Sequence, residues 1–402
     1  MENCETIDTS KRKGKIKMRI SERALAIEPS LTRQLFSMAS QYDDVIDLTL
    51  GDPDIIPAEA IRAAAASAVM EGITRYSANA GLISARTVIA DTFYEEYQLE
   101  IDPAENMMMT VGGMEGLYLA LASIINPGDE VIIHAPYYVN YVQMVRMCGG
   151  VPVLIETDEN NNFLFTLEDV ERAISPKTVA MIINTPCNPT GQIINGKLLD
   201  TLSKILVEKD LLVISDEVYR TLVFEGEHES IITRPGMLER TIVIDSLSKR
   251  FAMTGYRIGF AVGPKQWIAN MIKMQENVAA CAPLPSQYAA IAAYSERKNN
   301  EELCNIFKER CSLMADAINN SKKIHCLKPV ATFYLFVNIE KTGMNSLDFA
   351  YELLEKVHVA VAPGIAYGKK YDSYIRIACT LNKKILLEAA DRILEFVNSL
   401  GE

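Results

Sequence analysis

The sequence is poor in the residue spacings that build metal centres and disulfide frameworks. Its eight cysteines are scattered without a Cys-x-x-Cys pair, and its four histidines have no spacing typical of metal ligands. We therefore predict no metal site, and we interpret the cysteines as the reduced thiols of a cytoplasmic protein.

Apart from a basic patch near the start of the chain, runs of like charge are missing, and so are long apolar runs. The net charge of −12 at pH 7 is spread along the chain, which argues against binding to nucleic acid or to anionic membranes. A basic patch occupies residues 11–17, but no apolar stretch follows it, so this region is neither a signal peptide nor a membrane span. We predict that residues 1–18 form a disordered basic leader.

The rest of the chain has the composition of a globular protein. With 402 residues, of which 49% are apolar and 23% charged, it can bury a large core, and we predict two domains. Apolar runs alternate with helical patterns across residues 61–300, which indicates a large α/β domain with a parallel sheet between helices. The patterns at residues 301–402 predict a smaller α+β domain, to which residues 19–60 contribute as an N-terminal arm.

Small or polar residues follow the apolar runs at the points where the predicted strands end. Because the carboxyl ends of parallel strands lie along one edge of a sheet, where open α/β sheets bind ligands, we predict one shared site. Each residue alone also has a purely structural interpretation, such as packing for a tyrosine or helix capping for an aspartate. The residues at these strand ends are Gly113, Tyr138, Asn188, Asp216 and Lys249.

Lys249 follows the apolar run at residues 241–244 and lies among small polar residues, including Ser246 and Ser248. A lysine at the mouth of an apolar core is partly desolvated, which lowers its pKa and favours the neutral, nucleophilic amine. Such an amine can form a Schiff base with an aldehyde. The alternative interpretation is that Lys249 and Arg250 form a solvated turn.

Two stretches of the chain match motifs of a known family. Ser-Leu-Ser-Lys-Arg-Phe-Ala-Met-Thr-Gly-Tyr-Arg-Ile-Gly, at residues 246–259, resembles the cofactor-lysine motif of the class I/II aminotransferases, which are pyridoxal-phosphate (PLP) enzymes. Asn-Thr-Pro-Cys-Asn-Pro-Thr-Gly, at residues 184–191, is similar to a second motif of that family. The resemblance implies fold type I, with a mostly parallel seven-stranded sheet in the large domain.

The resemblance also implies which residues hold PLP. Lys249 holds it covalently, and Ser246 and Arg257 hold its phosphate, a role that suits a hydroxyl and the planar fork of arginine. The backbone at Gly113 and Met114 lies near the same phosphate, since a glycine pair lets N–H groups approach an anion at a helix N-terminus.

Four further residues are implied to act on the cofactor ring or its neighbour. Tyr138 stacks on the ring, while Asn188 and Tyr219 donate to the ring oxygen. Asp216 keeps the ring nitrogen protonated, which PLP needs in order to act as an electron sink. Tyr76 reaches across a homodimer interface to the phosphate in the neighbouring site, so the predicted active unit is a homodimer.

Arg376 stands in an otherwise apolar strand, where an unpaired guanidinium is unfavourable. An internal carboxylate is one explanation, and the resemblance implies another: a two-pronged pair with the α-carboxylate of the substrate. Gly51 is implied to lie near the same carboxylate. The aspartate-using branch of the family has lysines where this chain has Glu28 and Met114, so an aromatic, aliphatic or specialised donor is as plausible as an acidic one.

The resemblance implies an aminotransferase that moves an amino group between an L-amino acid and a 2-oxo acid by a ping-pong mechanism. Its predicted catalytic residues are Lys249, Asp216 and Tyr219. A lyase, decarboxylase or cyclising synthase of the same fold would keep the cofactor and break a different bond. A binding or regulatory protein on this fold would have lost the lysine or gained a DNA-binding segment, and a nucleotide-binding oxidoreductase would need a Gly-x-Gly-x-x-Gly fingerprint, which the chain lacks.

Overall fold

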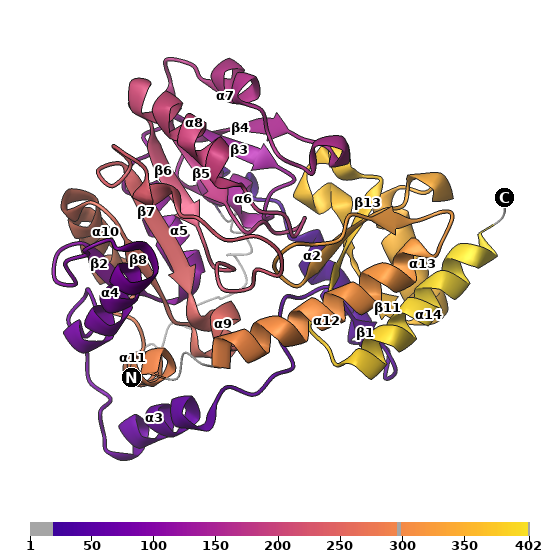
Figure 1. Cartoon of the computed structure of the whole chain (residues 1–402), viewed down its shortest axis with the longest axis horizontal. Helices are drawn as coiled ribbons and strands as arrows, with labels where there is room; N and C mark the ends of the chain where they lie inside the picture. Colours follow the sequence, from indigo (N-terminus) through magenta and orange to yellow (C-terminus); the bar gives the residue numbers. More distant parts are fainter. Residues whose placement is uncertain (1–18, 296–298, 401–402) are drawn as a thin grey trace, which may run out of the picture.

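A seven-stranded sheet lies at the centre of the larger part of the molecule (Figure 1). The computed structural model describes residues 19–295 and 299–400, so the predicted leader at residues 1–18 lies outside the described residues. The prediction of a mostly parallel seven-stranded sheet is confirmed, because all neighbouring pairs from β7 to β4 run parallel and only the pairs made by β8 are antiparallel. In spatial order the strands are β2 (Met107–Thr110), β8 (Gly259–Val262), β7 (Thr241–Ser246), β6 (Leu212–Asp216), β5 (Thr178–Asn184), β3 (Glu130–Ala135) and β4 (Val151–Glu156).

Strand β4 lies at one edge of this sheet and differs from the central strands. Of its side chains only Ile155 is buried, and Pro152 lies within it. Proline is tolerated at a sheet edge because no ladder hydrogen bond is lost there. The apolar run of β4 is interrupted by Pro152, whereas the runs of the central strands β5, β6 and β7 contain no proline.

The strands carry apolar side chains on both faces, which is why their sequences read as unbroken apolar runs. Successive residues of β7 show this, since Ile242 and Ile244 belong to the core on one face while Val243 belongs to the core on the other. The first face is covered by α5 (Gly112–Ala122), α6 (Asn140–Met147) and α10 (Lys265–Val278). The second is covered by α4 (Ile83–Tyr97), α7 (Leu167–Ala173), α8 (Gly196–Glu208) and α11 (Leu284–Ser295), with α3 (Glu59–Met70) outside α11.

A smaller antiparallel sheet forms the other part of the molecule, on the right of Figure 1. Its strand order is β12 (Ala362–Pro363), β13 (Tyr374–Ala378), β10 (Tyr334–Asn338) and β9 (His325–Cys326). Helices α12 (Asn299–Asn319), α13 (Ser346–Val357) and α14 (Lys383–Ser399) pack with it. The N-terminal segment joins the same core, because β1 (Ile46–Asp47) pairs in parallel with β11 (Val359–Ala360) and Leu35 and Leu48 are buried there.

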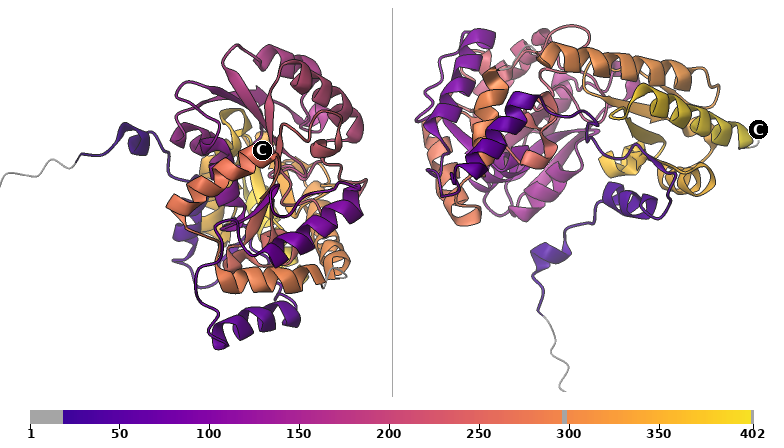
Figure 2. Two further views of the ribbon diagram at one scale, coloured as in Figure 1. Left: turned by 90° about the vertical axis from the view of Figure 1, so that its left-hand side faces the viewer. Right: turned by 90° about the horizontal axis from the view of Figure 1, so that it is seen from below.

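Apolar residues at helical spacing across residues 20–40, such as Leu25, Leu31 and Leu35, predict a helix, and the structure contains two helices there. α1 (Glu22–Leu25) ends before Pro29, and α2 (Leu31–Ala39) begins after Ser30, whose hydroxyl accepts a hydrogen bond from the Arg33 N–H. A proline and a capping serine side by side favour a new helix start over continuation. Figure 2 shows α1 standing away from the body of the molecule, and none of its residues is buried.

Within residues 19–295 and 299–400, no helix has both the length and the apolar character needed to cross a membrane.

Candidate active site

A cavity of about 670 Å³ lies where the carboxyl ends of the central strands face the smaller sheet and α2. The predicted site residues come together here from many separate elements, as expected for the strand-end edge of an α/β sheet. Tyr76 is the exception, because it lies outside the cavity wall and is 85% exposed. The predicted residues that line the cavity are Gly51, Gly113, Met114, Tyr138, Asn188, Asp216, Tyr219, Ser246, Lys249, Arg257 and Arg376.

Lys249 lies in α9 (Leu247–Arg250), a single helical turn that follows β7 directly. Ser246 caps this turn by accepting a hydrogen bond from the Ser248 N–H at 3.2 Å. The Lys249 ammonium donates to the Gly51 carbonyl oxygen at 2.5 Å. Burial lowers the pKa of Lys249 to about 8, and the positive charges of Arg376 and Arg257 act in the same direction. A substantial share of the amine is therefore neutral near pH 8, as a nucleophile requires.

Asp216 ends β6 and is buried at the base of the cavity. Burial raises its pKa to about 6, while hydrogen bonds from the Tyr141 hydroxyl and the Val218 N–H oppose that shift. The Tyr141 hydroxyl donates to Asp216 Oδ2 at 2.5 Å. At neutral pH the carboxylate is therefore mostly ionised in an apolar setting, where it interacts strongly with a nearby cation.

The two asparagines of the 184–191 motif connect the ends of neighbouring strands. Asn184 Nδ2 donates to the Asp216 carbonyl oxygen at 3.1 Å, and Asn184 Oδ1 accepts from the Asn188 N–H at 2.9 Å. This fixes Asn188, whose Oδ1 accepts from Arg376 Nη1 at 3.0 Å and whose Nδ2 remains a donor at the cavity. The hydroxyl of Tyr219 lies 3.1 Å from that of Tyr334.

Arg376 lies in the middle of β13 and is almost completely buried. Within the described parts of the chain, no carboxylate forms an ion pair with it, so an internal acidic partner does not explain its position. It donates to Asn188 and to the Thr49 carbonyl oxygen, but its Nε has no hydrogen-bond partner. The ring of Tyr334 packs 4.2 Å from its Cζ atom. A buried guanidinium with free donors facing a cavity is a binding site for an anion.

A second group of donors gathers at the N-terminus of α5. Gly112 has φ +70°, and a Cβ atom added there would lie 2.5 Å from Arg257 Nη2. Only glycine permits this approach, which brings the Arg257 guanidinium beside the first N–H groups of the helix. Ser246 lines the cavity at the same place. Hydroxyl, guanidinium and helix N–H groups together match the requirements of a phosphate.

Tyr138 and Met114 contact each other in the cavity wall. The Tyr138 hydroxyl lies 3.4 Å from Met114 Sδ and accepts a hydrogen bond from Asn140 Nδ2 at 3.0 Å. These contacts hold the partly buried Tyr138 side chain against the wall, between the end of β3 and α5.

Several residues of the cavity were not predicted from the sequence. Each is an aromatic or polar side chain whose local pattern is that of ordinary packing or of a solvated surface, so no sequence signal marked it as part of a site. The Tyr367 hydroxyl and Thr32 Oγ1 are buried against each other in the cavity wall. The unpredicted residues include Thr32, Arg33, Phe36, Asn140, Tyr141, Tyr334 and Tyr367.

A family model described as aminotransferase class I and II matches residues 43–393. The chain is 35% identical to aromatic-amino-acid aminotransferase 2 of Thermococcus litoralis, over 94% of this chain and 97% of that protein. It is 37% identical to an aspartate aminotransferase of Pyrococcus abyssi with the same coverage. Its structure is similar to that of the aspartate aminotransferase from Thermus thermophilus with maleate, with a TM-score of 0.89 and 32% identity over 94% of this chain and 100% of that chain. The similarity therefore extends over both sheets and the cavity between them.

Proposed function

Because this chain belongs to the class I and II aminotransferase family and is an enzyme that transfers amino groups, we propose that it uses PLP in a ping-pong reaction between an L-amino acid and a 2-oxo acid. The observation that carries the proposal is the position of Lys249. Its partly buried amine, with a pKa of about 8, lines the same cavity as the buried carboxylate of Asp216 and the donors around Arg257.

The chemical features of PLP fit these residues one by one. The aldehyde needs a neutral amine, which Lys249 supplies. The ring nitrogen needs an anion in an apolar setting, which Asp216 supplies at neutral pH because its pKa is about 6. The phosphate fits Ser246, Arg257 and the start of α5, where Gly112 leaves space for the approach. When bound, PLP supplies an electron sink that stabilises negative charge at the substrate Cα atom.

The protein then binds and orients the amino acid. Arg376 binds the α-carboxylate with the N–H groups that its protein contacts leave free, and Asn188 holds the guanidinium in place. Lys249 Nζ takes the proton from the Cα atom of the amino acid in the first half-reaction. In the second half-reaction it returns a proton to the corresponding carbon of the 2-oxo acid. Because Arg376 fixes the α-carboxylate, it also restricts the direction of the Cα–H bond. The bound substrate is therefore held close to a reactive geometry.

The lining of the cavity supports a donor with a large apolar side chain. Phe36, Met114 and Leu117 line it, whereas the carboxylate of Glu28 lies 3.6 Å from Arg146 and outside the wall. Burying an aromatic side chain against such groups is favourable by about 25 cal/mol for each Å² removed from water. Arg33 adds a cation to the lining, so dicarboxylic donors belong in the same test.

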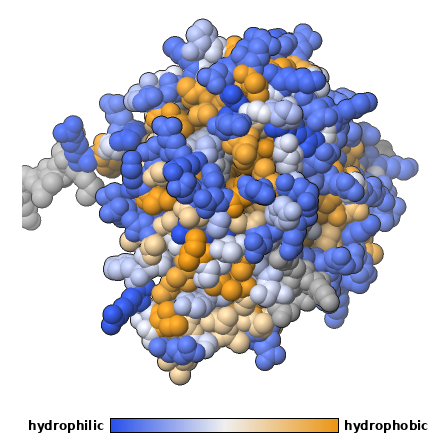
Figure 3. Space-filling model, turned by 60° about the vertical axis from the view of Figure 1, so that its left-hand side comes forward, coloured by the Kyte–Doolittle hydropathy of each residue, from blue (hydrophilic) through white to orange (hydrophobic). Residues whose placement is uncertain are grey.

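A homodimer in the cytoplasm forms part of the same proposal. Ile56, Met70 and Tyr76, in α3 and the segments next to it, are 73%, 86% and 85% exposed, and a second copy that covers them would remove apolar surface from water. Figure 3, in which the left-hand side of Figure 1 comes forward, shows apolar surface between the hydrophilic regions. A second copy on this surface brings Tyr76 to the partner's phosphate site. The free thiols of the described cysteines support a reducing compartment.

The test uses protein loaded with PLP, a panel of aromatic, aliphatic and dicarboxylic donors, and 2-oxoglutarate. We expect glutamate to form only when donor and 2-oxoglutarate are both present, fastest with aromatic donors. Lys249→Ala is expected to lose both this activity and the visible absorbance of covalently attached PLP. Release of ammonia or carbon dioxide without a 2-oxo acid would identify the lyase or decarboxylase alternative instead.

A further inference from the structure

Two charged residues flank the segment from Ser246 to Lys249 and take no part in lining the cavity. Asp245 comes directly before Ser246, and Arg250 comes directly after Lys249. Their side chains are only 1% and 4% exposed. Because ionised groups are rarely buried without partners, both must be paired inside the protein.

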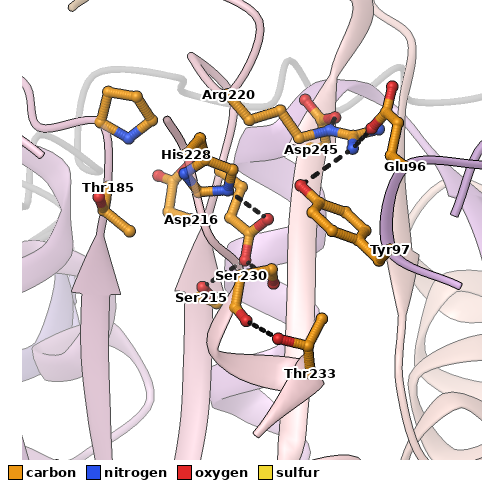
Figure 4. Close-up of polar contacts among 12 residues, drawn as sticks. Glu96, Tyr97, Thr185, Ser215, Asp216, Arg220, His228, Ser230, Thr233 and Asp245 are labelled. Atoms are coloured by element: carbon orange, nitrogen blue, oxygen red, sulfur yellow. Dashed lines mark hydrogen bonds and ion pairs between the residues drawn. The ribbon is translucent and has the colours of Figure 1, made fainter. Parts of the chain in front are cut away.

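Arg220 is the partner of Asp245. Its Nε donates to Asp245 Oδ2 at 2.7 Å, and the other oxygen of Asp245 accepts from the Ser246 N–H at 2.6 Å. The Arg220 side chain is 2% exposed and packs with its Cζ atom 5.1 Å from the ring of Phe93. Figure 4 shows it between Asp245 on one side and Glu96 on the other.

Glu96, from α4, completes the cluster by binding both arginines. Its Oε2 accepts from Arg220 Nη1, and its Oε1 accepts from Arg250 Nη2 at 3.0 Å. Two guanidinium groups and two carboxylates give a cluster with no net charge, which lowers the penalty for burying it. Both arginines keep the pKa of Glu96 below its usual value, although burial acts in the opposite direction.

The cluster joins the two segments that carry the chemistry. Arg220 directly follows Tyr219 in the turn after β6, and its own N–H is bonded to the Glu217 carbonyl oxygen at 2.9 Å. Asp245 stands in β7, two residues before the turn that carries Lys249 begins at Leu247. The ion pair therefore links these two segments through side chains that do not line the cavity.

We propose that Arg220 is a positioning residue that sets Lys249 against Asp216 and Tyr219 through its buried fork to Asp245 and Glu96. The proposal rests on the proposed function, because it concerns the geometry of the same proton transfer. Misplacing a reacting group by about 1 Å can slow a reaction by about a hundredfold. An arginine suits this task, because its planar fork holds two acceptors in fixed directions, whereas a lysine is a point charge on a flexible chain.

The test compares Arg220→Lys with Arg234→Lys in protein loaded with PLP. Arg234 also bridges two carboxylates, at 2.9 Å from Asp200 and 2.5 Å from Glu229, but it does not line the cavity or touch the lysine segment. Single-turnover rates with saturating amino donor, the donor concentration for half-maximal rate, and the thermal midpoint are measured for each. Arg220→Lys keeps the charge and is expected to lower the rate at least tenfold with little change in half-saturation, while Arg234→Lys leaves the rate unchanged.

A second variant keeps the test decisive if Arg220→Lys folds poorly. Asp245→Asn retains the shape of the side chain but has one acceptor oxygen instead of two, so it breaks the same link. We expect a similar loss of rate, and the double variant should be no slower than the slower single variant, because both changes cut one connection. PLP affinity from fluorescence titration should weaken in parallel.

Two results would overturn the proposal. One is a single-turnover rate for Arg220→Lys equal to that of the unaltered protein. The other is a double variant whose rate loss is the product of the two single losses, since that would show independent effects. These results can be told apart from a failure of the proposed function. In that case the unaltered protein itself would show no reaction between bound PLP and the amino donor in the single-turnover assay.

Discussion

Replacing Lys249 with methionine should stabilise the cofactor-free protein. The folded state holds the Lys249 ammonium in a setting that lowers its pKa from 10.5 to about 8, so the charged form is less favourable than in the unfolded chain. Methionine has a similar length and carries no charge, and it can pack in the same space beside Phe333.

The size of the effect follows from the two pKa values. The difference, 10.5 − 8, corresponds to about 3 kcal/mol of unfavourable free energy when the amine is protonated in both states. The variant also loses the hydrogen bond to the Gly51 carbonyl, which contributes about 1 kcal/mol. We therefore expect Lys249→Met to raise the free energy of unfolding by about 2 kcal/mol at pH 7.

The sign of the pH dependence is fixed by the lowered pKa. Below pH 8 both states are protonated and the destabilisation is fully present; between pH 8 and 10.5 the folded protein loses the proton first, and the destabilisation declines. The gain from Lys249→Met should thus fall by about 1 kcal/mol between pH 7 and pH 9.

Urea unfolding of cofactor-free protein, followed by circular dichroism at pH 7 and pH 9, measures this gain. Lys265→Met serves as the control, because this lysine is an exposed residue paired with Glu105, and its replacement should change stability little at either pH. A Lys249→Met variant that is less stable than the parent at pH 7, or whose gain is the same at both pH values, would refute the reasoning.

Two further predictions concern the cavity, and a third concerns the exposed Tyr76. Tyr141→Phe removes the hydrogen bond that lowers the pKa of Asp216, so that pKa should rise above about 6 and the acidic limb of the kcat/KM profile should move up by about one pH unit; an unmoved limb would contradict this role. Gly112→Ala forces a Cβ atom against Arg257 at a φ of +70°, so PLP affinity in a fluorescence titration should fall about tenfold or more, whereas equal affinity would show that the glycine is dispensable. Tyr76→Phe should weaken PLP retention during dialysis while leaving the thermal midpoint of the cofactor-free protein unchanged; unchanged retention would remove Tyr76 from the site.

The strand ends could be predicted because their signal is local. A buried parallel strand is an apolar run, and the residue that breaks the run must stand at the sheet edge, so Asn188, Asp216 and Lys249 were predicted to meet from spacing alone. The role of each residue could not be read in the same way. Those roles came from the resemblance of the motifs at residues 184–191 and 246–259, and the family match confirms that resemblance.

The residues that support the site gave no comparable signal. Tyr141 lies on the apolar face of an amphipathic helix, where a tyrosine is ordinary packing. Its hydrogen bond to Asp216 joins residues 75 positions apart in the sequence. Arg220 follows a predicted site residue, yet its partner Asp245 lies 25 positions further on and Glu96 lies 124 positions before it.

The sequence by itself determined the alternation of strands and helices, the strand-end chemistry and the family, because periodicity and motifs are properties of neighbouring residues. The tertiary structure alone decided which tyrosine meets Asp216, which charges surround the lysine segment, and that Arg376 faces the cavity without a carboxylate partner in the described chain. Those pairings depend on how separate strands and helices pack, and no local pattern encodes the distance between side chains brought together only by folding.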